Sequence, residues 1–93
     1  MASLFLYAAY VFIGKVKQVW KAAFSVEIEE GEIRVGDGIA FEFPVDFNEQ
    51  LVTSLHLNDA EVEVASATCE VGIRREESTP NVKSGMLVYR ITP

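Results

Sequence analysis

The sequence is poor in the residues that build covalent, metal and nucleotide sites. It has one cysteine, Cys69, so an intrachain disulfide is impossible, and one histidine, His56, so a metal site would depend on carboxylates. A single cysteine is typical of a reducing compartment, and we expect a cytoplasmic protein. No glycine-rich phosphate loop ending in Lys-Ser or Lys-Thr occurs, which argues against nucleotide hydrolysis. The sequence therefore predicts no metal or other cofactor.

Positive charge is also scarce. Eight lysines and arginines stand against 14 aspartates and glutamates, which gives a net charge of −6. Nucleic-acid affinity depends mainly on basic groups that displace counterions from phosphates. RNA is therefore disfavoured as a partner unless the few cations gather on one face.

A long hydrophobic run is missing as well. The longest apolar stretch, Leu4–Ile13, has ten residues, whereas a membrane-spanning helix needs about 20. No positive charge precedes it, as a secretory signal would require. We expect no membrane span and interpret the stretch as a buried first strand. Two alternatives stay open: a self-associating edge that uses Phe5, Tyr7 and Phe12, and a targeting or membrane-contact segment.

Sustained helical periodicity is absent, and short alternating runs separated by turn residues replace it. Strands are predicted over Tyr10–Trp20 (with a bulge or bend at Gly14), Lys21–Glu29, Ile33–Val35, Ile39–Phe43, Phe47–Leu57, Glu70–Arg75 and Met86–Ile91. Glu61–Ala65 either pairs or crosses over. Gly36-Asp37-Gly38 and Asn58-Asp59 are predicted turns. The pattern predicts one all-β domain over residues 1–93, a small closed antiparallel barrel of six to seven strands or a small sandwich.

The order of several short motifs resembles domain 2 of elongation factor Tu-like translation factors, including stand-alone proteins made of this barrel alone. The matching segments are Gly14-Lys15-Val16, Gly31 to Ile39, Val52 to Leu55, Val62 to Ala65, Val71-Gly72-Ile73 and Gly85 to Val88, so the resemblance covers about residues 12–92. Thr68-Cys69 and Met86 depart from the family pattern at turns. The resemblance implies the closed barrel without the family's GTPase part. It also implies contact with RNA, because domain 2 of elongation factor Tu helps to hold aminoacyl-tRNA.

Two groups of side chains were weighed for chemistry. Cys69 and His56 form the only thiol–imidazole combination, but catalysis would need them about 3 Å apart, and nothing in the sequence brings them together. We expect an inert thiol. The acidic cluster Glu27, Glu29, Glu30 and Glu32 is interpreted as a solvated strand face, with a docking surface for a basic partner or a metal site as alternatives.

The cations supply the remaining candidate site. Lys15, Lys17, Lys21, Arg74 and Arg75 are predicted to form a basic patch for RNA or another partner, with Trp20 as a stacking residue. The aromatic residues Trp20, Phe24, Phe41, Phe43 and Phe47 are nevertheless expected mainly in the core.

The sequence thus favours a protein that is not an enzyme. The leading hypothesis is a binding or adaptor module that acts through protein–protein contacts with an unknown partner, including self-association. The alternative is an RNA- or ribosome-associated accessory domain of translation. A thiol function of Cys69 is a third and weaker hypothesis.

Overall fold

The computed structural model describes residues 9–42, 47–76 and 82–92, and every regular element within them is a β-strand. The strands are β1 (Ala9–Val19), β2 (Ala23–Ile28), β3 (Glu32–Arg34), β4 (Gly38–Glu42), β5 (Phe47–Leu51), β6 (Leu55–Leu57), β7 (Ala60–Val62), β8 (Val64–Ser66), β9 (Glu70–Arg74) and β10 (Leu87–Thr92). The described residues contain no helix that is long and apolar enough to cross a membrane. The all-β prediction is confirmed.

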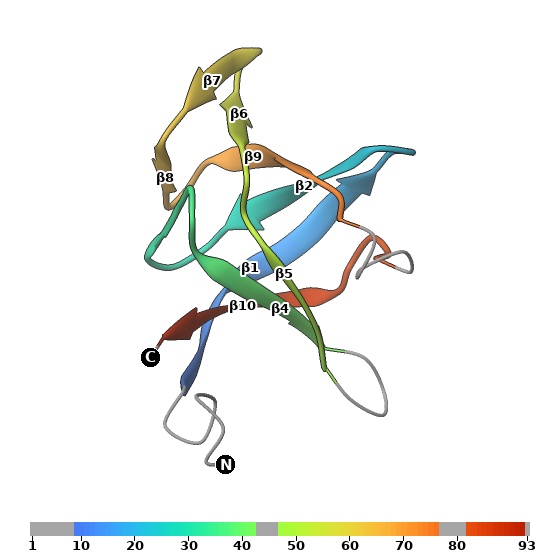
Figure 1. The fold of residues 1–93 in the computed structure, drawn as a ribbon, viewed down its shortest axis with the longest axis vertical. Coiled ribbons are helices and arrows are strands. Elements are labelled where there is room, and N and C mark those ends of the chain that lie inside the picture. Colours follow the sequence, from blue (N-terminus) through green and yellow to red (C-terminus); the bar gives the residue numbers. More distant parts are fainter. Residues whose placement is uncertain (1–8, 43–46, 77–81, 93) are drawn as a thin grey trace.

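Eight of the strands form one antiparallel sheet in the order β5-β4-β10-β1-β2-β9-β6-β7, and β3 pairs with β8 in a second, two-stranded sheet. The large sheet curls, so that β5 crosses in front of β1 and β10 (Figure 1). Ala9 at the start of β1 pairs with Thr92 at the end of β10. The prediction of six to seven strands undercounts, because β3, β6, β7 and β8 have only three residues each.

Cross-strand pairs place the apolar side chains on the concave face of the sheet. Val26 lies between Val16 and Val71, and Phe24 pairs with Ile73. The buried core consists of Ile13, Val16, Phe24, Val26, Ile28, Ile33, Ile39, Phe41, Val52, Leu55, Ala65, Val71, Ile73, Val82 and Val88. Along β2 the side chains of Ser25 and Glu27 lie on the opposite face of the strand, as the two-residue period requires, although Ser25 is also buried.

Two irregularities bend β1, the longest strand. Its pairing register with β10 shifts between Phe12 and Gly14, and its register with β2 shifts between Val16 and Gln18. The predicted bulge at Gly14 is therefore confirmed. A Cβ atom at Gly14 would lie 1.9 Å from the carbonyl oxygen of Glu27, so only glycine allows the two backbones to approach this closely.

Both predicted turns are confirmed. Asn58 and Asp59, with φ of 52° and 64°, join β6 to β7, which is the backbone that a type I′ hairpin turn needs. In the Gly36-Asp37-Gly38 turn between β3 and β4, the Asp37 carboxylate accepts a hydrogen bond from the Arg34 N–H at 2.8 Å. Gly36, with φ of 99°, takes a backbone conformation in this turn that favours glycine.

One predicted strand, Phe47–Leu57, is wrong because the chain breaks at Val52. The Val52 N–H donates to the carbonyl of Asp37, and its own carbonyl accepts from the Gly36 N–H, so the β3–β4 turn takes both of its backbone groups. The segments before and after the break, β5 and β6, lie far apart in the strand order. As a result Leu51 is 61% exposed while Leu55 is buried, although a single strand would put both side chains on one face.

The aromatic residues follow the core prediction only in part. Phe24 and Phe41 are fully buried, with ring centroids 5.2 Å apart in an edge-to-face contact. Trp20 is 51% exposed, so its placement in the core was wrong. The predictions for Phe43 and for the side chain of Phe47 lie outside the described residues.

Candidate binding site at the hairpin between β1 and β2

The turn of the β1–β2 hairpin lies beside the end of β9. The Trp20 N–H donates to the carbonyl of Ala23 at 2.7 Å and closes the turn, and Ala23 then pairs with Arg74. The Arg75 N–H donates to the carbonyl of Ala22 at 2.9 Å. The pairing of β2 with β9 thereby unites Trp20, Lys21, Arg74 and Arg75, which we call the hairpin-tip cluster.

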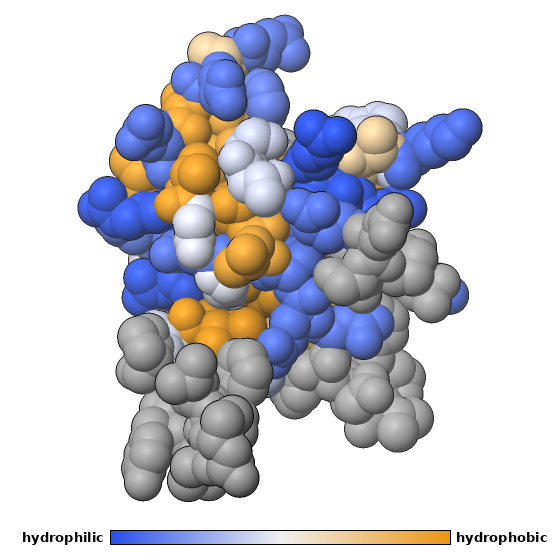
Figure 2. Space-filling model, in the orientation of Figure 1, coloured by the Kyte–Doolittle hydropathy of each residue, from blue (hydrophilic) through white to orange (hydrophobic). Residues whose placement is uncertain are grey.

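The chemistry of the hairpin-tip cluster is that of a contact surface. Trp20, Lys21 and Arg74 are exposed. Hydrophilic side chains gather around the tip of the β1–β2 hairpin on the face seen in Figure 2. Exposed tryptophan and arginine are the residues that most often dominate binding energy at protein interfaces. Because Trp20 leaves half of its surface in water, a partner that covered the indole would gain free energy from burying it.

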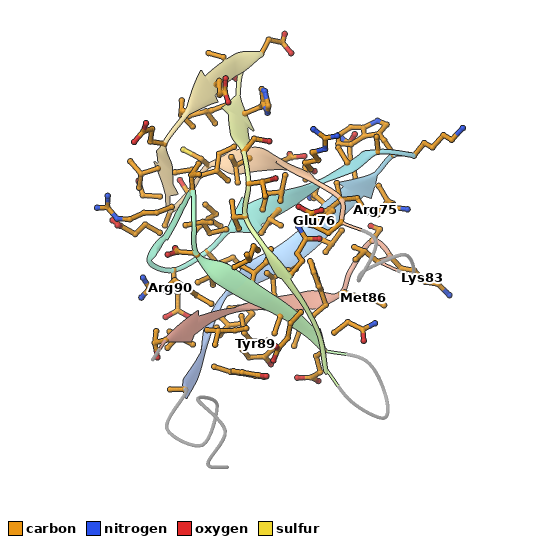
Figure 3. All side chains as sticks on the ribbon, in the orientation of Figure 1. Arg75, Glu76, Lys83, Met86, Tyr89 and Arg90 are labelled. Atoms are coloured by element: carbon orange, nitrogen blue, oxygen red, sulfur yellow. The ribbon has the colours of Figure 1, made fainter. Side chains whose placement is uncertain are left out.

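Arg75 has hydrogen-bonding capacity that the described structure does not use. Its side chain lies near the hairpin, at the end of β9 (Figure 3). Its Nε and Nη2 atoms are buried and have no hydrogen-bond partner among the residues that the structure describes. Burying unpaired polar donors costs about 1–3 kcal/mol each, and more for charged groups. Arg75 would therefore lose no hydrogen bond from these two atoms by turning toward an external carboxylate or phosphate.

Two other members of the predicted basic patch lie elsewhere and are neutralised. The Lys15 ammonium is 3.9 Å from the Glu29 carboxylate, and the Lys17 ammonium is 3.8 Å from that of Glu27. Glu32 pairs with Arg34 at 2.7 Å. By contrast, none of the three cations in the hairpin-tip cluster forms an ion pair within the described ranges. Of the five cations that form no ion pair among the described residues, three thus lie at the tip, and the other two are Lys83 and Arg90.

Lys83 was missed in the sequence as a candidate. The turn that contains it packs against β1, because the Ser84 hydroxyl donates to the carbonyl of Lys17 at 2.9 Å and the Gly85 N–H to that of Val16 at 2.8 Å. Lys83 is exposed and lies on the same side of the molecule as Arg75 in Figure 3. Only this packing of the turn against β1 reveals the placement, since 67 positions of sequence separate Ser84 from Lys17.

The predicted alternatives for chemistry gain little from the structure. His56 is exposed on β6, and no hydrogen bond joins it to the partly buried Cys69 thiol among the residues described. The described residues also contain no group of three or more histidine, cysteine or acidic side chains that could hold a metal ion. Glu27, Glu29 and Glu32 take part in the ion pairs above, which fits their interpretation as a solvated face.

A second surface, the outer face of β1 and β10, carries aromatic residues. The rings of Phe12 and Tyr89 meet edge to face with centroids 5.9 Å apart. The Tyr10 hydroxyl donates to the Glu49 carboxylate, which raises the pKa of Tyr10 to about 12 with further help from burial. Tyr89 donates to Glu42 at 2.7 Å, and this bond likewise raises the Tyr89 pKa. Of the predicted self-association residues, Phe12 is partly covered here, whereas Phe5 and Tyr7 lie outside the described residues.

Gln50 connects distant parts of the curled sheet. Its side chain is buried, and its amide donates to the carbonyl of Arg74 at 2.9 Å while its oxygen accepts from the Glu76 N–H at 3.3 Å. The bridge joins β5, at one edge of the sheet, to the end of β9. It therefore holds the chain next to Arg75 in place.

Comparison with known proteins adds evidence on the fold. No family model matches the sequence, and no curated protein matches it. The C-terminal domain of a Geobacillus thermoleovorans "putative U32 peptidase" has a similar structure, with a TM-score of 0.73 and 15% sequence identity over 97% of this chain and 98% of that domain. A selenomethionine variant of the same domain gives a TM-score of 0.68 and 18% identity over 84% of this chain and 96% of that one. At these identities the likeness shows a shared fold, an all-β architecture with a curled antiparallel sheet.

Proposed function

We propose that this chain is a non-catalytic binding or adaptor module and that it contacts a partner protein through the hairpin-tip cluster. The observation that carries the proposal is the meeting of exposed Trp20 with the unpaired cations Lys21, Arg74 and Arg75. The matching partner offers an apolar recess for the indole and carboxylates for the guanidinium groups, since arginine binds carboxylates in a bidentate geometry. A fold that also occurs as the C-terminal domain of a larger protein fits an accessory role.

Single-stranded RNA is the second candidate ligand, and one observation favours it. An exposed tryptophan next to cations is the combination on which successive bases stack while phosphates are neutralised. The net charge of −6 opposes it, and only three cations in the cluster are free to meet phosphates. With three contacts, the logarithm of RNA affinity should fall with the logarithm of salt concentration with a slope of about −2.

We test the proposal by affinity capture from a lysate of the native cell, with two variants that remove the same charge. Lys21→Gln/Arg74→Gln discharges the hairpin-tip cluster, and Lys15→Gln/Lys17→Gln discharges two cations that are already paired with glutamates. We expect one protein to be retained by the wild type and the control but lost from the tip variant, with or without ribonuclease. Equal capture by both variants contradicts the proposal. Capture that disappears with ribonuclease favours RNA instead.

We further propose that the curled sheet is the closed barrel of the elongation-factor domain-2 type and that the protein is cytoplasmic. Closure is supported by the Gln50 bridge from β5 to the end of β9 and by the hydrogen bonds of Val52 with the β3–β4 turn. The cytoplasmic location is supported by the single free cysteine. The resemblance in motif order supports the family assignment, and a crystal structure compared with domain 2 of these factors would test it.

A further inference from the structure

The outer face of β9 carries two opposite charges on either side of a glycine. Val71 and Ile73 are buried in the core. The alternate residues Glu70, Gly72 and Arg74 therefore share the opposite, outer face, on which the two charged side chains are exposed. With a rise of about 3.3 Å per residue, these two residues lie about 13 Å apart along the strand. Because glycine has no side chain, nothing of β9 fills the surface between the two charges.

The neighbouring strands place polar side chains on both sides of Gly72. β9 lies between β2 and β6 (Figure 1), and Ser25 of β2 and His56 of β6 both pair with Gly72. Directly opposite residues share one face of a sheet, so these two side chains flank the glycine. A Cβ atom at Gly72 would lie 3.7 Å from that of His56, which is exposed. A hydroxyl and an imidazole thus border the surface over Gly72.

The carboxylate of Glu70 is held in place on this face. The Ser25 hydroxyl donates to it at 2.6 Å and itself accepts from the Gln18 N–H at 3.1 Å. Glu27, directly opposite Glu70 on β2, lies 3.8 Å from the Lys17 ammonium. Glu70 itself forms no ion pair within residues 9–42, 47–76 and 82–92. A carboxylate that is already fixed loses little freedom on binding, so Glu70 is preorganised for an external cation.

The charges along this face favour a ligand with both a negative and a positive group. A purely anionic ligand would meet the charge of Glu70, and a purely cationic one would meet that of Arg74. A small zwitterion is too short to reach across about 13 Å, whereas an extended peptide has the same rise per residue as β9 and also turns alternate side chains to one face. An acidic and a basic residue four positions apart in such a peptide therefore match the spacing of Arg74 and Glu70. The residue midway between them falls over Gly72.

We infer that the outer face of β9 binds an extended peptide segment in which an acidic residue contacts Arg74 and a basic residue, four positions away, contacts Glu70. The middle residue of the segment covers Gly72 between Ser25 and His56. Arg74 also belongs to the hairpin-tip cluster. The inference rests on the proposed function in this one respect, because it assigns the segment to the partner that contacts the tip.

Two synthetic peptides of equal composition serve as probes, each flanked by the same serines. One contains Glu-Thr-Val-Thr-Lys, with the charges four positions apart and on one face. The other contains Glu-Thr-Val-Lys-Thr, with the charges three positions apart and on opposite faces of an extended chain. Nuclear magnetic resonance of the ¹⁵N-labelled chain measures the affinity of each. We expect the first peptide to shift the amides of Glu70–Arg74, and the second to bind about fivefold more weakly, because it engages only one of the two charges at a time.

A pair of variants tests whether the peptide lies over Gly72. Gly72→Leu covers this surface, and its Cβ atom meets its neighbours only at ordinary van der Waals distances. Ala60→Leu is the matched control, since Ala60 is exposed on β7 but alternates with Glu61, which lies on the face of His56. We expect Gly72→Leu to lose affinity for the first peptide and Ala60→Leu to keep it, with both folded by circular dichroism.

The outcomes separate this inference from the proposed function. Lys21→Gln weakens the tip but leaves the outer face of β9 intact, so it should bind the first peptide like the wild type. Failure of the proposed function appears in the capture experiment, as equal retention by the tip variant and its control. Absence of peptide binding, equal affinity for the two peptides, or an unchanged affinity in folded Gly72→Leu would overturn the inference about β9.

Discussion

At the scale of single residues, Gly14 and Gly72 show how differently two strand glycines constrain the fold. A Cβ atom at Gly14 would lie 1.9 Å from the Glu27 carbonyl oxygen, and the other atoms nearest to it also belong to the backbone of β2 rather than to a flexible side chain. A Cβ atom at Gly72 would meet His56 at 3.6 Å, an ordinary van der Waals distance. The first glycine is therefore required by the approach of β1 to β2, whereas the second is not required by packing.

We predict that Gly14→Ala lowers the free energy of unfolding by about 2–3 kcal/mol, as overpacking does in a tight interior. Gly72→Ala, the matched control, should change it by no more than about 0.5 kcal/mol. Urea denaturation followed by circular dichroism measures both values. Equal stability of the two variants would mean that β1 and β2 are not in the close contact described.

The Tyr10–Glu49 hydrogen bond predicts a particular response to pH. The tyrosine pKa is about 12 in the folded protein and 10.0 without this contact, so the folded state holds the phenol proton more tightly. The stabilisation is therefore complete below pH 10 and disappears as the pH rises toward 12. Tyr10→Phe should be less stable than the wild type at neutral pH, and the difference should vanish in this alkaline range.

Denaturant unfolding at a series of pH values, together with the ultraviolet absorbance of tyrosinate, measures this effect. Phe12→Leu is the control, because it alters the neighbouring aromatic contact without removing a titrating group. Its difference in unfolding free energy from the wild type should show no comparable dependence on pH. A stability difference for Tyr10→Phe that stays constant through the alkaline range would contradict the assigned hydrogen bond.

At the scale of elements, the strands were predictable where each strand supplies its own pattern. Alternation locates β2 and β9, and turn residues locate the β3–β4 and β6–β7 reversals. The break at Val52 was not predictable, because its cause is a pair of hydrogen bonds to the turn at Gly36 and Asp37, far away in the sequence. The alternation of Leu51, Thr53, Leu55 and Leu57 continues through the break. It therefore predicts a single strand where the structure has two, β5 and β6.

The same reason explains the partial success of the site prediction. The residue types were recognisable from the sequence, since tryptophan and arginine are enriched among the residues that dominate binding energy at interfaces. Their grouping depends on which strands pair. The register of β1 with β2 sets Lys15 opposite Glu27 and leaves Lys15 and Lys17 neutralised, whereas the pairing of Ala23 with Arg74 completes the hairpin-tip cluster.

The hydrogen bonds of Gln50, which join β5 to the end of β9, give a further prediction. Gln50→Leu removes the hydrogen bonds of the side chain with the Glu76 N–H and the Arg74 carbonyl, each of which contributes about 0.5–1.5 kcal/mol to stability. The Glu76 amide should exchange faster with deuterium. Gln18→Leu is the control, because Gln18 is exposed and its side chain makes no hydrogen bond in the described part of the chain, so its stability should remain close to that of the wild type. Unchanged stability and exchange in Gln50→Leu would show that the bridge does not hold β5 to β9.

At the scale of the whole molecule, charge and apolar surface are separated along β1. The N-terminal half of the strand, from Ala9 to Gly14, is uncharged, while the hairpin at its other end presents Trp20 beside cations that form no ion pair within the described residues. The ion pairs of Lys15 and Lys17 lie between these two regions. The contact surface proposed above therefore lies at the end of β1 where the exposed indole meets cations that form no ion pair within the described residues.

The emission of Trp20, the single tryptophan of the chain, tests the central claim most directly. The partner protein retained in the capture experiment is added to the wild type and to Lys21→Gln/Arg74→Gln, with Lys15→Gln/Lys17→Gln as the control. If the partner itself contains tryptophan, this chain is labelled with 5-fluorotryptophan and its signal is followed by fluorine nuclear magnetic resonance. We predict that the emission of the wild type and the control shifts to shorter wavelength as the indole leaves water, and that the tip variant binds at least tenfold more weakly, a loss of about 1.4 kcal/mol. Binding that leaves the Trp20 signal unchanged would place the contact elsewhere and contradict the account.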